Sequence, residues 1–214
     1  MVSNLHFLFD LDGVIIDSMP LHTQSWGIYL ENHGVSADSL VARMHGKRND
    51  QIVRDIFGST LSEEEVFQHG ANKEALFREM MSLRIEEFLV PGVEEFLQKY
   101  RHLGLGLGSN AEPANIDFVL DRAGLRKYFE AVTNGQQVVH PKPAPDIYLK
   151  LAEHFDIDPS DCIVFEDSAT GVAAGVSAGM KVVGIATSEK WLPGVEVMVR
   201  DFRDPSLQKW LEGL

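Results

Sequence analysis

Four short polar groups in this sequence combine carboxylates, a lysine and small hydrogen-bonding side chains. They are Asp10 with Asp12, Ser109-Asn110, Lys142-Pro143 and Glu166-Asp167-Ser168. Carboxylates offer the oxygen ligands that a small hard cation such as Mg²⁺ prefers, and a lysine ammonium balances the charge of an anion. Phosphoryl transfer depends mainly on positioning and on neutralising charge at the phosphate oxygens. The set is therefore suited to that chemistry, provided that the fold brings the four groups together.

The elements expected around these groups place them at one edge of a sheet. A short apolar run at residues 5–9 leads directly into Asp10. After Pro91-Gly92, helical patterns alternate with short apolar runs, which lie at residues 105–108, 131–133, 163–165 and 181–185. Repeated units of this kind predict a parallel sheet with helices on both faces. Ligands of such sheets bind at the carboxyl ends of the strands, so we expect the polar groups to meet there.

A long helical stretch separates the first strand from the rest of the predicted sheet. Residues 20–88 show helical patterns only, and Ser62 begins a capping-box sequence that marks a helix start. Because the first strand needs partners that arrive only after this stretch, we predict an insertion. The expected fold is α/β, a Rossmann-like three-layer core with a parallel sheet at residues 1–16 and 90–214, interrupted by an all-helical cap at residues 17–89.

Composition narrows the class of protein. The 214 residues are 44% hydrophobic and 24% charged, the balance of an ordinary soluble globular protein. The net charge of -13 comes without a clustered basic stripe, so we expect neither a nucleic-acid nor a membrane partner. The only cysteine, Cys162, lies in an apolar run and is expected to be a buried strand residue. With no leader or membrane-span pattern at the start, we expect a cytoplasmic protein, a monomer or weak dimer.

The order and spacing of the four groups resemble the haloacid dehalogenase superfamily, in particular the capped branch of β-phosphoglucomutases and sugar-phosphate phosphatases. The resemblance covers nearly the whole chain. Its most specific stretches are residues 9–14, 142–146 and 165–168, followed by Gly171-Val172 and Ala178-Gly179. Each stretch alone has a simpler reading, because Asp-x-Asp is common in turns and an acidic group is favoured at a helix start. The ordered set is what points to the family.

The resemblance implies a role for each carboxylate. Asp10 is the expected nucleophile, which forms an aspartyl-phosphate and so divides one difficult step into two. Asp12 is the expected acid and base, first protonating the leaving oxygen and then deprotonating water. Mg²⁺ is the expected cofactor, bound by the side chains of Asp10, Glu166 and Asp167 and, as the resemblance implies, by the backbone carbonyl of Asp12.

The remaining expected contacts hold the phosphate and the rest of the substrate. Lys142 is expected to neutralise phosphate charge, and Ser109 with Asn110 to donate a hydroxyl and backbone amides near a helix start at Glu112-Pro113. In the insertion, three further substrate contacts are expected. They are His22 in the first helix, and Lys47 and Arg48 in a loop that Gly46 opens.

Within the family, Asp12 favours transfer of phosphate from oxygen, because the dehalogenases and phosphonate-cleaving members lack it. The predicted function is Mg²⁺-dependent hydrolysis of a small phosphorylated metabolite such as a sugar or polyol phosphate. A β-phosphoglucomutase-type phosphomutase is the alternative. Glu112 and Asn49 stand where such a mutase commonly carries a lysine and an arginine, although Lys47 and Arg48 could compensate. Two other classes stay open, a receiver-like signalling module, which has no need of a cap, and a protein that binds a phosphorylated ligand without turnover.

Overall fold

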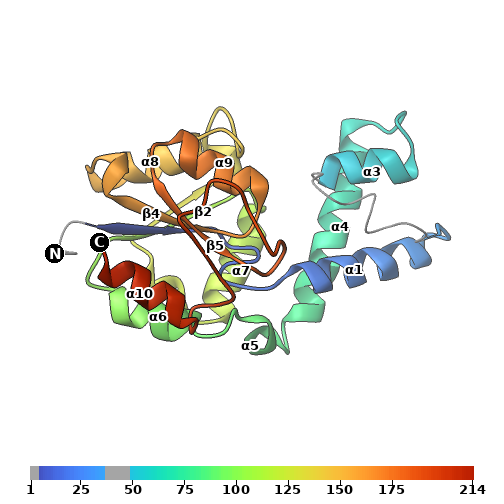
Figure 1. The fold of residues 1–214 in the computed structure, drawn as a ribbon. Coiled ribbons are helices and arrows are strands. Elements are labelled where there is room, and N and C mark those ends of the chain that lie inside the picture. The colour runs from blue at the N-terminus through green and yellow to red at the C-terminus, as the bar shows by residue number, and fades with distance from the viewer. Residues whose placement is uncertain (1–4, 37–48) are drawn as a thin grey trace. The chain divides into compact units, whose positions relative to one another are not determined.

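The computed structural model describes residues 5–36 and 49–214 and divides the chain into two compact units (Figure 1). One unit joins the chain up to Asp17 with Glu86–Leu214, and the other is Ser18–Ile85. The predicted loop positions Lys47 and Arg48 lie outside the described residues. Within those residues, no helix has both the length and the apolar character needed to cross a bilayer.

The first unit is built on a six-stranded sheet in the order β3-β2-β1-β4-β5-β6. All of its neighbouring strands are parallel, and the strands are β1 (His6–Phe9), β2 (Leu105–Ser109), β3 (Ala131–Asn134), β4 (Cys162–Glu166), β5 (Lys181–Ile185) and β6 (Val197–Val199). The α/β class with a parallel sheet is thus confirmed. Because β1 lies at the centre between β2 and β4, the residues that follow all three strands emerge side by side.

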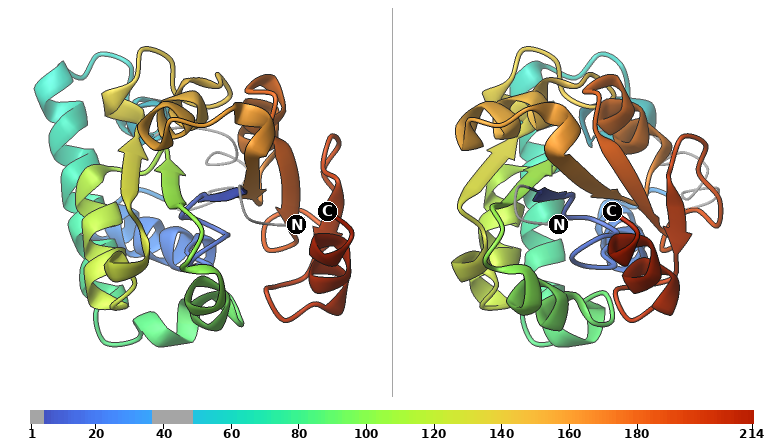
Figure 2. Two further views of the ribbon diagram at one scale, coloured as in Figure 1. Left: turned by 90° about the vertical axis from the view of Figure 1, so that its left-hand side faces the viewer. Right: turned by 60° about the vertical axis from the view of Figure 1, so that its left-hand side comes forward.

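Helices cover both faces of this sheet (Figure 2). They are α6 (Val93–Tyr100), α7 (Pro113–Arg122), α8 (Asp146–Phe155), α9 (Ala169–Ser177) and α10 (Pro205–Glu212), with 3₁₀ turns η1 (Arg126–Tyr128), η2 (Gly135–Gln137) and η3 (Pro159–Asp161). The short helix α5 (Ile85–Phe88) spans the point in the chain at which the two units divide. Helices α8 and α9 lie over one face, and α6 and α10 over the other (Figure 1).

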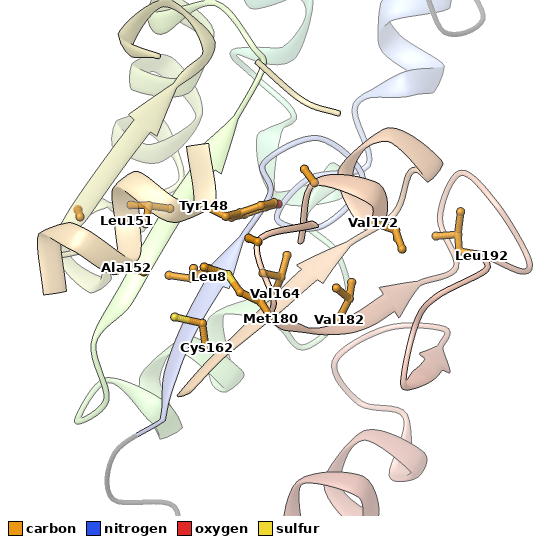
Figure 3. Close-up of a cluster of buried hydrophobic side chains, with 13 residues drawn as sticks. Leu8, Tyr148, Leu151, Ala152, Cys162, Val164, Val172, Met180, Val182 and Leu192 are labelled. Carbon is orange, nitrogen blue, oxygen red and sulfur yellow. The ribbon is translucent and has the colours of Figure 1, made fainter. Parts of the chain in front are cut away.

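The two cores of this unit follow from the alternation of side chains along β1. Leu8 packs with Val164 and Val182 beneath α8 and α9, in the cluster of Figure 3. Phe7 and Phe9 point to the opposite face, where the Phe9 ring stacks on Phe165 with 4.7 Å between centroids. Cys162 is fully buried in β4, as its apolar surroundings predicted.

The second unit is helical, with α1 (Met19–Asn32), α3 (Asn49–Phe57) and α4 (Glu63–Met81). Its core contains Trp26, Tyr29, Leu30, Ile52, Val53 and Val66. The predicted capping box is present, since the backbone N–H of Ser62 donates to Glu65 Oε2 at 2.8 Å and that of Glu65 to Ser62 Oγ at 3.3 Å. The capping box fixes the start of α4, the longest helix among the described residues.

Candidate active site

Asp10 is the first residue after β1, at the carboxyl edge of the sheet. Its backbone N–H donates to Phe165 O at 3.0 Å, which extends the pairing of β1 with β4 by one residue. The chain then turns sharply, with Gly13 at a φ of 75° and its N–H bonded to Ile16 O at 2.7 Å. Asp10 is only 7% exposed, so its carboxylate is largely removed from solvent. A turn on the surface would have left it solvated.

Lys142 places its ammonium between two buried carboxylates. Nζ donates to Asp10 Oδ1 at 2.8 Å and to Glu166 Oε1 at 2.6 Å. The residue is buried, unlike a typical surface lysine in a proline-rich loop. Asn110 holds the loop in place: its Nδ2 donates to Lys142 O, and the Lys142 N–H donates to its Oδ1, both at 3.2 Å. The side chain of Asn110 therefore serves the lysine loop.

Glu166 ends β4 and is fully buried. Its Oε1 accepts from Lys142 and from the hydroxyl of Tyr148, each at 2.6 Å. Its Oε2 accepts from the Asp167 N–H and from Ser168 Oγ, each at 3.2 Å. These four hydrogen bonds fix the orientation of the Glu166 carboxylate.

Asp167 is held by residues that follow β5. Ser188 Oγ donates to Asp167 Oδ2. Thr187 Oγ1 donates to Gly13 O at 2.6 Å and lies 3.4 Å from Asp167 Oδ2. The loop after β5 thus ties Asp167 to the turn that follows Asp10.

Two glycines allow backbone to approach these carboxylates closely. A Cβ on Gly13 would lie 1.8 Å from Asp167 Oδ2, and a Cβ on Gly171 would lie 1.9 Å from the Cδ and Oε1 of Glu166. Real Cβ atoms essentially never come within 3.0 Å of another heavy atom. Any side chain at either position would therefore displace a carboxylate of the cluster.

The cluster fits a hard divalent cation. Asp10, Glu166 and Asp167 each offer an oxygen, and these oxygens lie within 4.8 Å of one another. Burial raises the pKa of Asp10 to about 7 against the opposing effect of Lys142, and burial together with Asp10 raises the pKa of Asp167 to about 8. When all three are ionised, these buried carboxylates carry more negative charge than the single ammonium balances. An all-oxygen donor set of this kind is the one that Mg²⁺ takes.

Asp12 and Ser109 complete the sequence-predicted groups of this unit. Asp12 is partly exposed in the turn after Asp10, and its charge contributes to raising the pKa of both Asp10 and Asp167. Ser109 ends β2 and is buried, with Oγ accepting from the Ala111 N–H at 3.1 Å. All four polar groups predicted from the sequence thus belong to the first unit, around the ends of β1, β2 and β4.

His22 lies in the helical unit, within a buried polar cluster of that unit. Its Nδ1 is 2.6 Å from Lys73 Nζ, and its ring stacks on Phe77 with 3.8 Å between centroids. Lys73 is paired with Glu74 at 2.9 Å, and Asn49 Nδ2 donates to the same carboxylate oxygen. Burial and the charge of Lys73 lower the pKa of His22 to about 3. His22 is therefore a neutral imidazole.

Sequence reasoning did not single out Tyr148, Thr187 or Ser188. Tyr148 stands two residues after Asp146, at the edge of a stretch already noted, but its aromatic type in a helix pattern predicts a core residue. Thr187-Ser188 follow an apolar strand, the same position that identified the other groups. Their position after a strand could have indicated a site residue, but serine and threonine are too common in loops for that position alone to identify one.

Comparisons with known proteins agree with this geometry. Residues 5–179 match the sequence model of a family described as haloacid dehalogenase-like hydrolase. The chain is 31% identical over 179 residues to the fructose-1-phosphate phosphatase YqaB of Escherichia coli, covering 83% of this chain and 94% of that protein. It is 29% identical over 209 residues to the β-phosphoglucomutase of Bacillus subtilis, covering 94% and 91%. A crystal structure of β-phosphoglucomutase from Clostridium difficile superposes with a TM-score of 0.81 at 25% identity, covering 100% of this chain and 98% of that chain.

Proposed function

Because the chain belongs to the haloacid dehalogenase-like hydrolase family, we propose that it is a Mg²⁺-dependent phosphatase that acts through an aspartyl-phosphate on Asp10. The observation that carries the proposal is the contact of Lys142 with both Asp10 and Glu166, within a cluster of three buried carboxylates. A lysine so placed would balance the nucleophile and the phosphate it accepts. The helical unit is proposed to act as a cap that excludes water during transfer.

The proposed reaction has two displacements at phosphorus. A carboxylate oxygen of Asp10 attacks, the bond from phosphorus to the substrate oxygen breaks, and Asp12 protonates the leaving alcohol. Water then attacks the same phosphorus, Asp12 takes its proton, and the bond to Asp10 breaks to release phosphate. Mg²⁺, held by Asp10, Glu166, Asp167 and the Asp12 carbonyl, would neutralise charge on the phosphate oxygens.

The residues of the phosphate site act mainly by position and charge. Lys142 supplies a point charge beside Asp10, and Ser109 supplies a hydroxyl at the adjacent strand end. The backbone amide of Asn110 is proposed to donate to the phosphate, and the nearby N-terminus of α7, which begins at Pro113, favours an anion. The side chain of Asn110 supports this arrangement through its two bonds to Lys142.

The substrate is proposed to be a phosphorylated sugar or polyol. Two relatives support this class, because their names state fructose 1-phosphate and phosphoglucose as what they act on. In the proposed mechanism, a phosphatase passes the aspartyl-phosphate to water and a mutase passes it to a second sugar oxygen. Hydrolysis and phosphomutase activity are therefore the two candidate reactions for this chain.

Hydrolysis is favoured over mutase chemistry by the charges at the positions where a mutase of this family is expected to carry cations. A mutase holds a bisphosphate, which requires cations at both ends. Asn49 is neutral and donates to Glu74, and the buried cation of the same cluster, Lys73, is already paired with that carboxylate. Glu112 stands at the N-terminus of α7, where it adds negative charge. The match to β-phosphoglucomutases over more than nine-tenths of the chain keeps the mutase as the second candidate.

The test is hydrolysis of p-nitrophenyl phosphate by the purified protein, with Mg²⁺ or with EDTA. Wild type is expected to turn over only with Mg²⁺, and Asp10→Asn to be inactive with an unchanged circular dichroism spectrum. Asp158→Asn, a substitution at a surface cap of η3, is the matched control and is expected to retain activity. Full turnover by Asp10→Asn would contradict the proposal.

A second assay separates hydrolysis from mutase chemistry. The enzyme is incubated with β-glucose 1-phosphate and a catalytic amount of glucose 1,6-bisphosphate, and the products are followed by ³¹P NMR. Release of inorganic phosphate without glucose 6-phosphate is expected. Accumulation of glucose 6-phosphate would favour the mutase.

A further inference from the structure

Tyr148 is a buried residue that belongs to none of the four polar groups. It lies in the first turn of α8 and has no exposed surface. Figure 3 shows its side chain extending from α8 alongside the apolar cluster of the sheet. A phenylalanine would fill the same apolar space. The hydroxyl is therefore the part of this side chain that packing alone does not require.

The hydroxyl and the ring of Tyr148 contact both members of one ion pair. The hydroxyl donates to Glu166 Oε1 at 2.6 Å, and Lys142 Nζ lies over the ring, 4.8 Å from its centroid. The same Glu166 oxygen accepts from Lys142. The buried hydroxyl has lost its bonds to water, a loss that its bond to Glu166 offsets. Tyr148 thus makes a two-point contact with the groups that face Asp10.

The hydroxyl of Tyr148 affects how strongly Glu166 attracts Lys142, because both donate to the same carboxylate oxygen. An oxygen that accepts from two donors is a weaker partner to each than an oxygen that accepts from one. Without the hydroxyl, Oε1 of Glu166 would turn toward Lys142 and draw the ammonium away from Asp10. It would also lose the bond that fixes the plane of the carboxylate. Groups that orient a metal ligand in this way change metal affinity by about 10–100-fold when removed.

We propose that Tyr148 is a positioning residue of the phosphoryl-transfer site, whose hydroxyl orients Glu166 for the cation and whose ring places Lys142 beside Asp10. This inference rests on the proposed function, because it assigns Glu166 to a Mg²⁺ site. It adds a residue outside the motifs that led to that function. It also predicts that the hydroxyl and the ring have separable effects.

The test is a Mg²⁺ titration of the metal-free 214-residue chain by isothermal calorimetry. Tyr148→Phe removes only the hydroxyl and is expected to raise the Kd for Mg²⁺ about tenfold or more. Tyr128→Phe is the matched control, because Tyr128 is also buried and its hydroxyl also donates to a glutamate, Glu94, at 3.4 Å. Its Kd is expected to equal that of wild type.

Kinetics give a second readout that a merely structural role would not produce. In Tyr148→Phe, the Mg²⁺ concentration for half-maximal hydrolysis of p-nitrophenyl phosphate is expected to rise by the same factor as the Kd. The KM for the phosphate ester at saturating Mg²⁺ is expected to stay within about twofold of wild type. Tyr148→Leu also removes the ring beneath Lys142. Its kcat at saturating Mg²⁺ is expected to be lower than that of Tyr148→Phe.

The outcomes distinguish this inference from the function on which it rests. Mg²⁺ binding by wild type with an unchanged Kd in Tyr148→Phe would overturn the role of Tyr148 and leave the proposed function standing. Absence of Mg²⁺ binding by wild type would overturn both. If Tyr148→Phe did not fold, Tyr148→Met, which also lacks the hydroxyl, would be titrated and judged by the same criterion.

Discussion

Replacing Gly171 by alanine tests the geometry of the site through one methyl group. Gly171 lies in α9, and its Cβ position is 1.9 Å from the Cδ and Oε1 of Glu166 and 2.0 Å from Oε2. Ordinary contacts of a Cβ begin at 3.4 Å, so the carboxylate would have to retreat by about 1.5 Å. A displacement of that size would lengthen the hydrogen bonds to Lys142 and Tyr148, both 2.6 Å long, beyond hydrogen-bond distance.

The magnitude follows from the two lost bonds. A hydrogen bond to a charged group contributes about 1.5–3 kcal/mol, and alanine gains about 1 kcal/mol over glycine in a helix interior. The expected net loss in the free energy of unfolding of Gly171→Ala is therefore about 2–5 kcal/mol. The displaced carboxylate would also leave the cation site, so that Mg²⁺ affinity and Mg²⁺-dependent turnover fall with stability.

The assays are urea unfolding, Mg²⁺ calorimetry and hydrolysis of p-nitrophenyl phosphate on three alanine variants. Gly175→Ala lies in the same helix, but its Cβ would meet Val182 at 2.8 Å in the core, so it should lower stability without affecting Mg²⁺ binding. Gly27→Ala, in α1, has no atom within 4 Å of its Cβ and should raise stability by about 1 kcal/mol.

The comparison between the two α9 variants is decisive. Gly171→Ala is expected to lose Mg²⁺ affinity and turnover, and Gly175→Ala to keep both. Wild-type Mg²⁺ affinity and turnover in Gly171→Ala would refute the account of how α9 supports Glu166. Equal losses in both variants would show that instability alone explains the effect.

Three further predictions concern charge and hydrogen bonding at the cluster. Burial raises the pKa of Asp10 to about 7 and that of Asp167 to about 8, so the folded metal-free protein retains protons that the unfolded chain releases. The free energy of unfolding of the metal-free protein should fall as pH rises from about 4 to about 8. The stabilisation that Mg²⁺ adds should grow over the upper part of that range. Urea unfolding with and without Mg²⁺ measures both trends, and a rise of metal-free stability with pH would contradict the prediction. Ser188→Ala should raise the Kd for Mg²⁺ about tenfold by removing the donor to Asp167, whereas Ser160→Ala, which removes a surface hydroxyl bonded to another aspartate, should leave that Kd unchanged. Lys142→Met should lower kcat/KM by about 10²-fold or more, and retained turnover would exclude a role for the ammonium.

The arrangement of the main site groups was predictable because strand order and residue type determine it. Parallel strands end at one edge, so polar residues at the ends of β1, β2 and β4 had to approach one another once the alternation of helices and strands was recognised. The capping box of α4 was predictable for the same reason, since it depends on residues three apart. These features require only local patterns and the rules of sheet topology.

Features that depend on side-chain packing were beyond sequence reasoning. Tyr148 has the pattern of a core residue, and only its position over Glu166 reveals the hydroxyl bond. Asn110 was expected to offer a backbone amide to phosphate, and only the fold shows that its side chain also bonds to the backbone of Lys142. Ser188 reaches Asp167 through the loop after β5, whose path no short pattern specifies.

Side-chain contacts within the helical unit could not be predicted from the sequence either. Nothing in the spacing of His22 and Lys73, fifty-one positions apart, predicts that they meet at 2.6 Å. Their contact requires α1 and α4 to pack at one register, which depends on how the core of that unit interlocks. The family resemblance singled out His22 near the start of the first helix of the insertion, and the structure shows its partner Lys73 and its lowered pKa.

The most direct test of the central claim is to trap the phosphorylated residue. The enzyme is quenched in acid during turnover of p-nitrophenyl phosphate with Mg²⁺ and reduced with borohydride, which converts an aspartyl-phosphate to homoserine. Peptide mass spectrometry then locates the reduced residue. Homoserine at position 10, absent when substrate is omitted, is the predicted result. Homoserine at Asp12 or Asp167 instead, or turnover without any reduced aspartate, would contradict the assignment of Asp10 as the nucleophile.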